Sequence, residues 1–345
     1  MTFAWDALLE QLVAGRDLTL EEAHAALSAI LAGEATAGQI GGFLVALRVK
    51  GVTADELCGV VRAMLEAAER VTVAPDAIDT CGTGGSDQRR HAAFNVSTIA
   101  ALVVAGAGGK VCKHGNRRAS ATSGSADVLE ALGVVIDLDG AGVAACVERS
   151  GIGFLLAPRF HAGMRHAGPV RRELGIRTVF NFAGPLANPA GVRRQVVGVA
   201  DGSMAPTVAR VLIANDAERA MVVFGHDGLD ELTVTGPSTL LEVRDGLVTE
   251  HSVEPEQFGF KRRAHAPEGG DTTANAELTR RVLDGEVGPH RDIVVLNAAA
   301  GLLVADVVDD LAAGVDAAIA ALDSGAAGEV LDNLVAVSNE VRPTA

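Results

Sequence analysis

The sequence predicts an α/β fold with a mostly parallel central sheet flanked by helices, plus a small all-α domain. After about residue 73, short β-branched runs alternate with alanine-rich helical stretches, which is typical of βαβ units. The first 72 residues lack such runs and instead indicate several short helices. Hydrophobic residues form 48% of the 345-residue chain and charged residues 21%, so we expect a globular protein with a substantial core.

Residues 1–72 are expected to form the small helical domain because three helix starts can be read there. Each is a hydroxyl residue followed three positions later by Glu or Gln, the pattern of a capping box. The pairs are Thr19 with Glu22, Thr36 with Gln39, and Thr53 with Glu56. Apolar residues follow at helical spacing, and they indicate either core packing within this domain or an interface between subunits.

Residues 73–345 are expected to form the large α/β domain. Its predicted strands are Ala77–Cys81, Lys110–Lys113, Val134–Leu138, Gly153–Ala157, Gln195–Ala200 and Ala220–Gly225. Residues 234–248 predict short antiparallel strands with a turn at Asp245-Gly246, and residues 263–275 an irregular loop. Helices are expected around 292–304, 308–322 and 325–339. Binding loops in such folds follow the carboxyl ends of the strands.

Charge and cysteine usage narrow the possible partners and compartment. A formal net charge of −15 with only 3% aromatic residues disfavours both nucleic acid and acidic membranes as partners. The four cysteines are widely spaced, which indicates buried thiols in a reducing compartment rather than disulfides or zinc ligands. No signal-peptide pattern opens the sequence, and the apolar stretch 293–305 is too short to span a bilayer. We therefore expect a cytoplasmic protein.

Two strand-end segments suit a doubly phosphorylated substrate. Gly82-Thr83-Gly84-Gly85 follows one predicted strand, and Lys113-His114-Gly115-Asn116-Arg117 follows the next. Glycines let backbone N–H groups approach an anion, while lysine adds a point charge and arginine a planar fork of donors. Between them, Asn95–Thr98 opens an apolar helix whose N-terminus also favours anions. The glycine turn alone would more often be only a turn, so its meaning depends on these neighbours.

Further polar segments extend this interpretation. Asp230-Glu231 at a strand exit suits Mg²⁺, which prefers oxygen ligands and substrate phosphates, although a solvated acidic turn is the alternative. The hydroxyl-rich stretch 120–125 opens another helix, and capping explains one of its hydroxyls but not all of them. Five arginines between residues 158 and 177 indicate anion handling, and one of them could grip a carboxylate through two hydrogen bonds.

With these motifs in place, the chain resembles the anthranilate phosphoribosyltransferase family, which has the nucleoside-phosphorylase-type phosphoribosyltransferase fold. The matching segments are Gly82–Gly85, Asn95–Thr98, Lys113–Arg117, Ser123–Leu132, Val170–Pro189, Gly225–Glu231, Gly269–Asp271 and Leu296–Ala299. The resemblance implies transfer of the phosphoribosyl group of 5-phosphoribosyl 1-diphosphate (PRPP) to anthranilate in tryptophan biosynthesis. It also implies Mg²⁺ as cofactor and a homodimer whose subunits meet through the small helical domain. Helices from about residues 160–180 would form part of that domain.

The resemblance also implies roles for individual residues. Lys113, Asn116 and Arg171 would be catalytic, and Ser97, Asp230 and Glu231 would serve Mg²⁺. The implied PRPP-binding residues are Gly82, Gly85, Ser86, Asn95, Val96, Ser97, Thr98, Lys113, His114, Gly115, Asn116, Arg117, Ser120, Ala121 and Ser125. The implied anthranilate-binding residues are Gly82, His114, Asn116, Arg171, Gly184 and Pro185.

The chain departs from the family pattern after the glycine turn. Ser86 follows Gly85 where the family usually has Asp, and the acid comes one position later. The loop to Asn95 is also a few residues longer, and Ala93 stands where a Thr often does. We expect Arg89 or Arg90, within this loop, to contribute to diphosphate affinity.

Two other functions remain possible from the sequence. A pyrimidine-nucleoside-phosphorylase-like enzyme could use the same scaffold with inorganic phosphate, and it should not need the Asp230-Glu231 pair. A non-enzymatic paralogue that binds nucleic acid should carry a basic, aromatic-bearing face, which the composition makes improbable.

Overall fold

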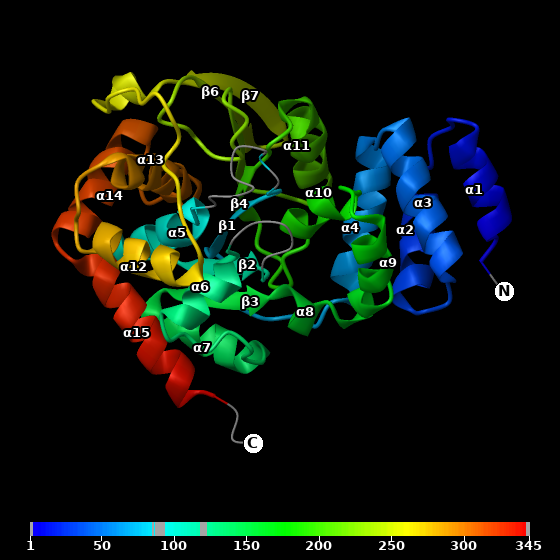
Figure 1. Ribbon diagram of the computed structural model, residues 1–345, viewed down its shortest axis with the longest axis horizontal. Helices are drawn as coiled ribbons and strands as arrows, with labels where there is room; N and C mark the ends of the chain where they lie inside the picture. Colours follow the sequence, from blue (N-terminus) through cyan, green and yellow to red (C-terminus); the bar gives the residue numbers. More distant parts are fainter. Residues whose placement is uncertain (1–2, 85, 87–93, 118–122, 343–345) are drawn as a thin grey trace.

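The computed structural model describes residues 3–84, 86, 94–117 and 123–342. It consists of a helical unit at the N-terminal side and a larger α/β unit (Figure 1), so the predicted fold class is confirmed. The helical unit contains α1 (Trp5–Val13), α2 (Leu20–Leu31), α3 (Ala37–Lys50) and α4 (Ala54–Ala67). Helices α9 (Gly168–Leu174) and α10 (Phe180–Leu186) lie beside it, and they contact α3 and α4, respectively.

The larger unit follows the expected alternation of strands and helices. Its strands are β1 (Ile78–Gly82), β2 (Val111–Gly115), β3 (Ile152–Leu156), β4 (Arg194–Gly198), β5 (Arg219–Gly225), β6 (Ser238–Arg244) and β7 (Leu247–Val253). Its other helices are α5 (Val96–Gly106), α6 (Ser125–Ala131), α7 (Gly140–Ser150), α8 (Ala157–Phe160), α11 (Ala205–Ala214), α12 (Thr272–Leu283), α13 (Pro289–Val304), α14 (Leu311–Asp323) and α15 (Ala326–Glu340). Short 3₁₀ turns occur at Ala162–Arg165, Gly202–Met204 and Pro255–Phe258.

The strands form one sheet in the order β3-β2-β1-β4-β5-β6-β7 across the described residues. Neighbours from β3 to β5 pair in parallel, and β6 and β7 extend the sheet antiparallel. The strand order reverses between β1 and β4, where Gly82 lies opposite Gly198. Ligands of open α/β sheets bind outside the carboxyl ends of the strands at such a switch point.

Two apolar clusters cover the two faces of the sheet. Along β5, Met221 and Val223 belong to one cluster, which α5, α13 and α15 complete. Ala220 and Val222 point to the opposite face and belong to the other, because side chains alternate along a strand. This second cluster also contains the core of the helical unit, together with apolar residues of α9, α10 and α11. The helical unit is therefore packed continuously onto one face of the sheet.

The predicted helix starts and the predicted hairpin turn are confirmed. The side chains of Thr19, Thr36 and Thr53 each accept the backbone N–H three residues later, and each partner returns the hydrogen bond. Asp245 and Gly246 both have positive φ, 53° and 73°, and they join β6 to β7. Positive φ at both central residues is what a tight type I′ hairpin needs.

Two predictions about secondary structure are wrong. Residues 134–138 alternate between core and surface as a strand would, but they pair with no strand in the described chain. A side chain from a distant helix replaces a strand partner here: the Val135 N–H donates to Ser338 Oγ on α15 at 3.1 Å. The predicted loop 263–275 also ends early, because the Asp271 side chain accepts the Ala274 N–H at 2.9 Å and starts α12 at residue 272.

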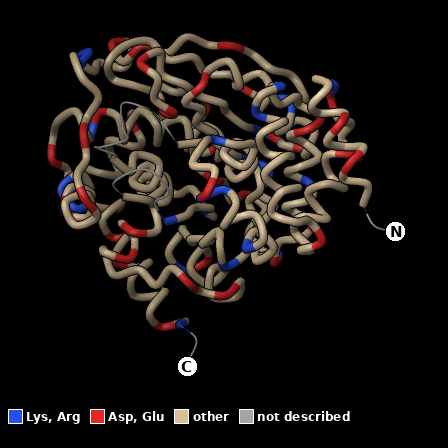
Figure 2. Tube along the Cα trace, turned by 45° about the vertical axis from the view of Figure 1, so that its right-hand side comes forward, with Lys and Arg blue, Asp and Glu red and all other residues tan. Residues whose placement is uncertain are grey.

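Acidic positions are spread over the whole trace rather than gathered in one region (Figure 2). Within the described residues, no single helix has the length and apolar composition needed to cross a membrane. Helices α14 and α15 meet those criteria only as a pair, with a bend of 66° between them.

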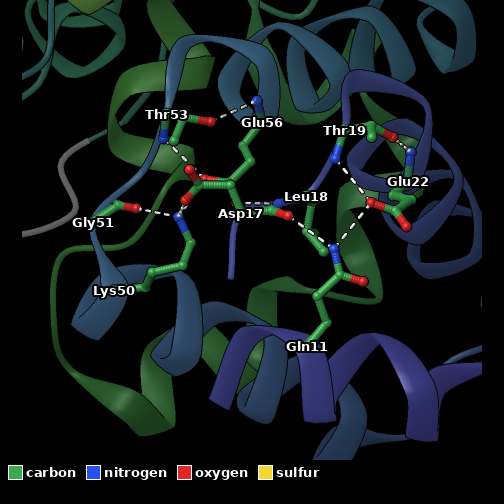
Figure 3. A network of polar contacts seen from close by, with 9 residues as sticks. All are labelled: Gln11, Asp17, Leu18, Thr19, Glu22, Lys50, Gly51, Thr53 and Glu56. Atoms are coloured by element: carbon green, nitrogen blue, oxygen red, sulfur yellow. Dashed lines mark hydrogen bonds and ion pairs between the residues drawn. The ribbon is translucent and has the colours of Figure 1, made fainter. Parts of the chain in front are cut away.

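A polar network ties the helices of the helical unit together (Figure 3). The buried Glu56 carboxylate accepts the backbone N–H groups of Leu18 and Thr53, each at 2.9 Å, and Lys50 Nζ at 3.0 Å. Lys50 also donates to Asp17 at 2.6 Å. Burial alone would lower the pKa of Lys50, but the hydrogen bonds to Asp17 and Glu56 outweigh burial and raise it. Glu56 thus serves as a capping residue, an ion-pair partner and a tether for the start of α2.

Substituting Glu56 with Ala should lower the free energy of unfolding by about 3 kcal/mol or more, because it leaves a buried ammonium short of one partner and orphans two N–H groups. Urea unfolding followed by far-UV circular dichroism measures the change. Glu66→Ala on the same helix is the matched control, since the exposed Glu66–His24 pair should contribute no more than about 1 kcal/mol. Equal effects of the two substitutions would contradict the role of Glu56.

Candidate active site

The two predicted anion-binding segments open at the same edge of the sheet. Strands β1 and β2 are parallel neighbours, so the turn after Gly82 and the segment after Gly115 leave the sheet on the same side. Helix α5 begins there at Val96, with Ser97 half-buried in its first turn. The Val96 and Thr98 N–H groups donate to the carbonyls of Phe94 and Asn95, so the Ser97 N–H is the one in this turn without an acceptor among the described residues. The dipole of the helix start also favours an anion at this position.

Lys113 lies at the centre of this edge, with only 2% of its surface exposed. Its Nζ donates to the carbonyl oxygen of Thr80 and, at 3.2 Å, to Ser97 Oγ. Burial lowers the pKa of Lys113, while the negative charges of Asp79 and Glu231 act in the opposite direction. An ammonium group has three hydrogens. Two have acceptors among the described residues, so one is left for a ligand.

Asp79 supplies the buried negative charge that faces Lys113. Its carboxylate accepts Asn188 Nδ2 at 2.9 Å and the backbone N–H of His114 at 3.2 Å. Burial raises the pKa of Asp79 to about 6, although Lys113 and the bond from Asn188 oppose this rise. Asn188 also donates to the Cys112 carbonyl at 2.8 Å, so it joins β1 to β2 behind the lysine. Asn188 and the His114 N–H thus fix the Asp79 carboxylate, whose charge acts on Lys113.

The Asp230 carboxylate is held directly over the glycine turn. Its Oδ2 accepts the Gly84 N–H at 2.7 Å. A Cβ on Gly82 would stand 2.4 Å from Asp230 Oδ2, and one on Gly198 would stand 1.8 Å from the Asp230 carbonyl oxygen. Both strand ends at the switch point must therefore be glycine if Asp230 is to lie there.

The neighbouring Glu231 is fixed through the chain that follows it. Asn297 on α13 accepts the Leu232 N–H at 3.0 Å and donates to the Leu232 carbonyl at 2.8 Å, as a paired strand would. Asp230 and Glu231 are both half-buried, and Glu231 lies close enough to act on the charge of Lys113.

This donor set fits Mg²⁺ that is shared with a substrate. The described residues contain no group of three or more His, Cys, Asp or Glu side chains able to hold a metal alone. Two carboxylates beside the Ser97 hydroxyl match the usual Mg²⁺ arrangement, in which a few protein oxygens are completed by water and phosphate. The metal would therefore be retained together with a phosphorylated ligand.

Buried hydroxyls around the same edge lack hydrogen-bond partners among the described residues. They are Ser86 Oγ, Thr98 Oγ1 and Ser123 Oγ. Because buried polar atoms are nearly always paired in proteins, these hydroxyls indicate a ligand with many acceptor oxygens. Asn95 likewise leaves its helix-capping position unfilled; it instead contacts Ser123 and Asn275 through hydrogen bonds of 3.4 and 3.3 Å.

Arg171 lies on α9 at the side of the helical unit. Its guanidinium stacks over the Phe180 ring at 5.0 Å, and burial lowers its pKa. Among the residues that the structure describes, it has no carboxylate partner. A half-buried guanidinium without a counterion suits the carboxylate of a ligand.

His114 connects the anion-binding edge to α10. Its ring contacts the backbone of Gly184 through a hydrogen bond and lies 5.2 Å from the His161 ring. Burial, and then the nearby His161, lower the pKa of His114 to about 3, so the ring stays neutral. Pro185, the next residue of α10, accepts hydrogen bonds at its carbonyl from Cys81 and Gln195. A Cβ on Gly184 would meet open space, which leaves room beside the histidine.

Most of the remaining candidate residues lie at this edge, but Arg117 is already engaged. Its guanidinium forms a bidentate ion pair with Glu130 at 2.6 and 3.0 Å, so its PRPP role stays a prediction that requires this pair to open.

Other candidate residues are placed as follows. Ser125 Oγ donates to the Asn116 carbonyl at 3.3 Å and lies next to the backbone of Gly115. The Val96 side chain is buried in the core, leaving only its backbone for a ligand. Gly85, Arg89, Arg90, Ala93, Ser120 and Ala121 lie outside the described residues.

Sequence reasoning missed Asp79 and gave Asn188 no role. Asp79 lies inside a predicted strand, where a lone acid is easily taken for a surface residue. One feature of the sequence could have identified Asp79. A fully buried parallel strand should contain no unpaired charge, so an acid within it indicates a buried partner.

Comparison with known proteins agrees with this geometry. The family model "Glycosyl transferase family, a/b domain" matches residues 74–328, and "Glycosyl transferase family, helical bundle domain" matches residues 6–68. An anthranilate phosphoribosyltransferase of Arthrobacter sp. (strain FB24) is 52% identical over 97% of this chain and 96% of its own length.

Solved structures agree as well. The crystal structure of anthranilate phosphoribosyltransferase from Thermus thermophilus has a TM-score of 0.89 and 41% identity, covering 96% of this chain and 99% of that one. The Saccharomyces cerevisiae enzyme, 27% identical, is known in complex with PRPP and Mg (TM-score 0.88, 97% and 98% coverage) and with 4-fluoroanthranilate (0.86, 99% and 100%).

The fold and the site thus define a two-domain glycosyltransferase with an anion-binding edge. Within that class, the chain belongs to the anthranilate phosphoribosyltransferase family.

The buried neutral His114 predicts a pH effect on stability. In the unfolded chain it gains a proton below about pH 6.5, whereas in the fold it does not until about pH 3. Its contribution is therefore complete above about pH 6.5 and is lost as the pH falls toward 3. Between about pH 7 and pH 5, wild type should lose about 2 kcal/mol more unfolding free energy than His114→Gln. Urea unfolding at both pH values measures this, and parallel losses would contradict it.

Proposed function

We propose that this enzyme transfers the 5-phosphoribosyl group of PRPP to the amine of anthranilate in tryptophan biosynthesis, releasing pyrophosphate. The observation that carries the proposal is the buried Lys113 ammonium, held beside the start of α5 and the Asp230-Glu231 pair. Few small molecules need a fixed cation, free N–H groups and metal-binding acids at one point, and a sugar diphosphate is one that does.

The diphosphate would lie across the ends of β1 and β2. The remaining Lys113 hydrogen, the Ser97 N–H and the unpartnered hydroxyls would donate to its oxygens. Lys113 is fixed before substrate arrives, because its Nζ donates to the Thr80 carbonyl and to Ser97 Oγ. Fixed donors stabilise the charge that develops on departing pyrophosphate without having to reorganise during the reaction.

Asp230, Glu231 and Ser97 would hold Mg²⁺ against the same diphosphate. When bound, the metal supplies positive charge that offsets the negative charge of the leaving group. The chain itself contributes the positions of the carboxylate oxygens. Gly82 and Gly198 leave the space that Asp230 occupies, and Asn297 fixes the segment after Glu231.

Anthranilate would enter between α9 and α10. Arg171 would grip its carboxylate and so aim its amine at the ribose, with His114, Asn116, Gly184 and Pro185 around the ring. The amine nitrogen forms a bond to C1 of the ribose while the bond from C1 to the diphosphate oxygen breaks, and the amine then loses a proton. An aryl amine is already neutral near pH 7, so no strong base is needed to prepare it.

We further propose that two copies pair through the helical unit. Val13 and Val49, on α1 and α3, are 77% and 83% exposed, so both could pack against a second copy. Light scattering during size-exclusion chromatography should give the mass of a dimer; a monomer would contradict the pairing.

Activity tests the proposed reaction directly. With PRPP and Mg²⁺, the purified enzyme should consume fluorescent anthranilate, and removal of Mg²⁺ with a chelator should stop the reaction. The matched control replaces PRPP and anthranilate with inorganic phosphate and uridine, the substrates of a nucleoside phosphorylase. Turnover in the control alone would overturn the proposal.

Arg171→Ala should raise the KM for anthranilate about tenfold or more, because a hydrogen-bonded charge pair is lost. The KM for PRPP should change by no more than about twofold, since the diphosphate lies elsewhere. Arg172→Ala is the matched control, an exposed arginine on the same helix. Equal effects on both KM values would be inconsistent with the carboxylate contact.

Asp230→Asn combined with Glu231→Gln should raise the Mg²⁺ concentration for half-maximal activity about tenfold or more, because both metal-binding charges are removed. Titrating activity with Mg²⁺ at saturating PRPP measures the shift. Asp245→Asn in the exposed hairpin turn is the control for loss of an acid. An unchanged titration rules out the ligand role.

A further inference from the structure

A cavity lies away from the reaction site, at the opposite ends of the strands. It has a volume of about 640 Å³ and is lined by α4, residues 186–193, the start of β4 and the end of α11. Because β4 and β5 begin there, it opens at the sheet edge opposite the glycine turn. This volume is within the usual range for small-molecule sites. We call it the back pocket, defined by Arg62, Arg70, Asn188, Arg193, Gln195 and Asn215.

The back pocket is positively charged although the chain carries a net charge of −15. Three arginines line it, against the single carboxylate of Asp216. Arg193 is paired with Glu218 at 2.9 Å. Arg62 and Arg70 have no carboxylate partner among the residues that the structure describes, and Arg62 donates only to the Ala214 carbonyl at 2.9 Å. Against the carboxylates of Asp216 and Glu218, the three arginines leave the cavity with an excess of one positive charge.

A buried donor without an acceptor lies at the same wall. Asn215 Nδ2 is buried and has no hydrogen-bond partner in the described part of the chain. Its Oδ1 is contacted only by Cys58 Sγ, at 3.9 Å. Because such orphaned donors are rare in folded proteins, this amide indicates a ligand that brings acceptor oxygens into the pocket.

The floor of the back pocket touches the reaction site through two buried amides. Asn188 donates to Asp79, which faces Lys113, and Gln195 donates at 3.3 Å to the carbonyl of Pro185. An occupant would therefore lie one residue away from groups of the reaction site, but at the opposite ends of the strands.

We propose that the back pocket is a second binding site, separate from the reaction site, for a small organic anion that carries phosphate or carboxylate groups. The forks of Arg62 and Arg70 would hold its charged groups, and Asn215 would donate to one of its oxygens. The proposal does not depend on which reaction the opposite edge catalyses.

Calorimetric titration at low ionic strength and without Mg²⁺ tests this, with inorganic phosphate in one arm and citrate in the other. The test variant is Arg62→Met/Arg70→Met, which keeps the apolar stems and removes the charges. Arg210→Met, an exposed arginine on α11 outside the pocket, is the matched control. Binding at the reaction site is common to all three proteins, so differences between them report the back pocket.

Wild type and Arg210→Met should bind one more equivalent of probe than the test variant, or bind it about tenfold or more tightly. A difference confined to phosphate identifies a phosphate compound, and one confined to citrate a polycarboxylate. Identical titrations of all three proteins in both arms, or an equal loss in Arg210→Met, would overturn the proposal. If the double variant does not fold, Arg70→Met alone serves, because Arg70 is exposed and its replacement disturbs no ion pair among the described residues.

Discussion

The charge of Lys113, buried at the junction of β1 and β2, is the constraint on which the rest of the site depends. An ammonium removed from water is costly unless charges and acceptors surround it. Asp79, the Thr80 carbonyl and Ser97 supply them, and these groups come from β1 and α5. Strand order therefore has a chemical consequence. If β1 and β2 were not parallel neighbours, neither the counter-charge nor the helix start would reach the lysine.

Other residues of this sheet edge are positioned near Lys113, each by a different physical interaction. Asp230 can pack against the backbone of Gly82 and Gly198 because neither glycine has a side chain in that space. A side-chain amide on α13 fixes the segment after Glu231. The helical unit contributes through packing, because α9 and α10 share its apolar cluster with one face of the sheet. Arg171 and Gly184 therefore lie on elements that pack with the helical unit, whereas α5 packs in the cluster on the other face of the sheet.

Much of this was readable from the sequence, because the signals were local. Capping boxes, the Asp245-Gly246 turn and the glycine turn after a strand each depend on residues a few positions apart. One error was local, because the Asp271 cap starts α12 inside the predicted loop. The other errors came from contacts between residues far apart in the sequence. Residues 134–138 alternate like a strand, yet only the distant Ser338 reveals that their backbone is served without one. Asp79 and Asn188 are 109 positions apart, and no spacing rule joins them. Arg117 looked free because its pairing with Glu130 depends on the angle of α6.

The most direct test of the account is a crystal structure of the enzyme with PRPP and Mn²⁺ in place of Mg²⁺, using anomalous scattering to locate the metal. A diphosphate oxygen should lie within hydrogen-bonding distance of Lys113 Nζ, and a metal peak should lie between that diphosphate and the side chains of Asp230 and Glu231. A diphosphate bound away from Lys113, or a metal with no contact to either acid, would contradict it.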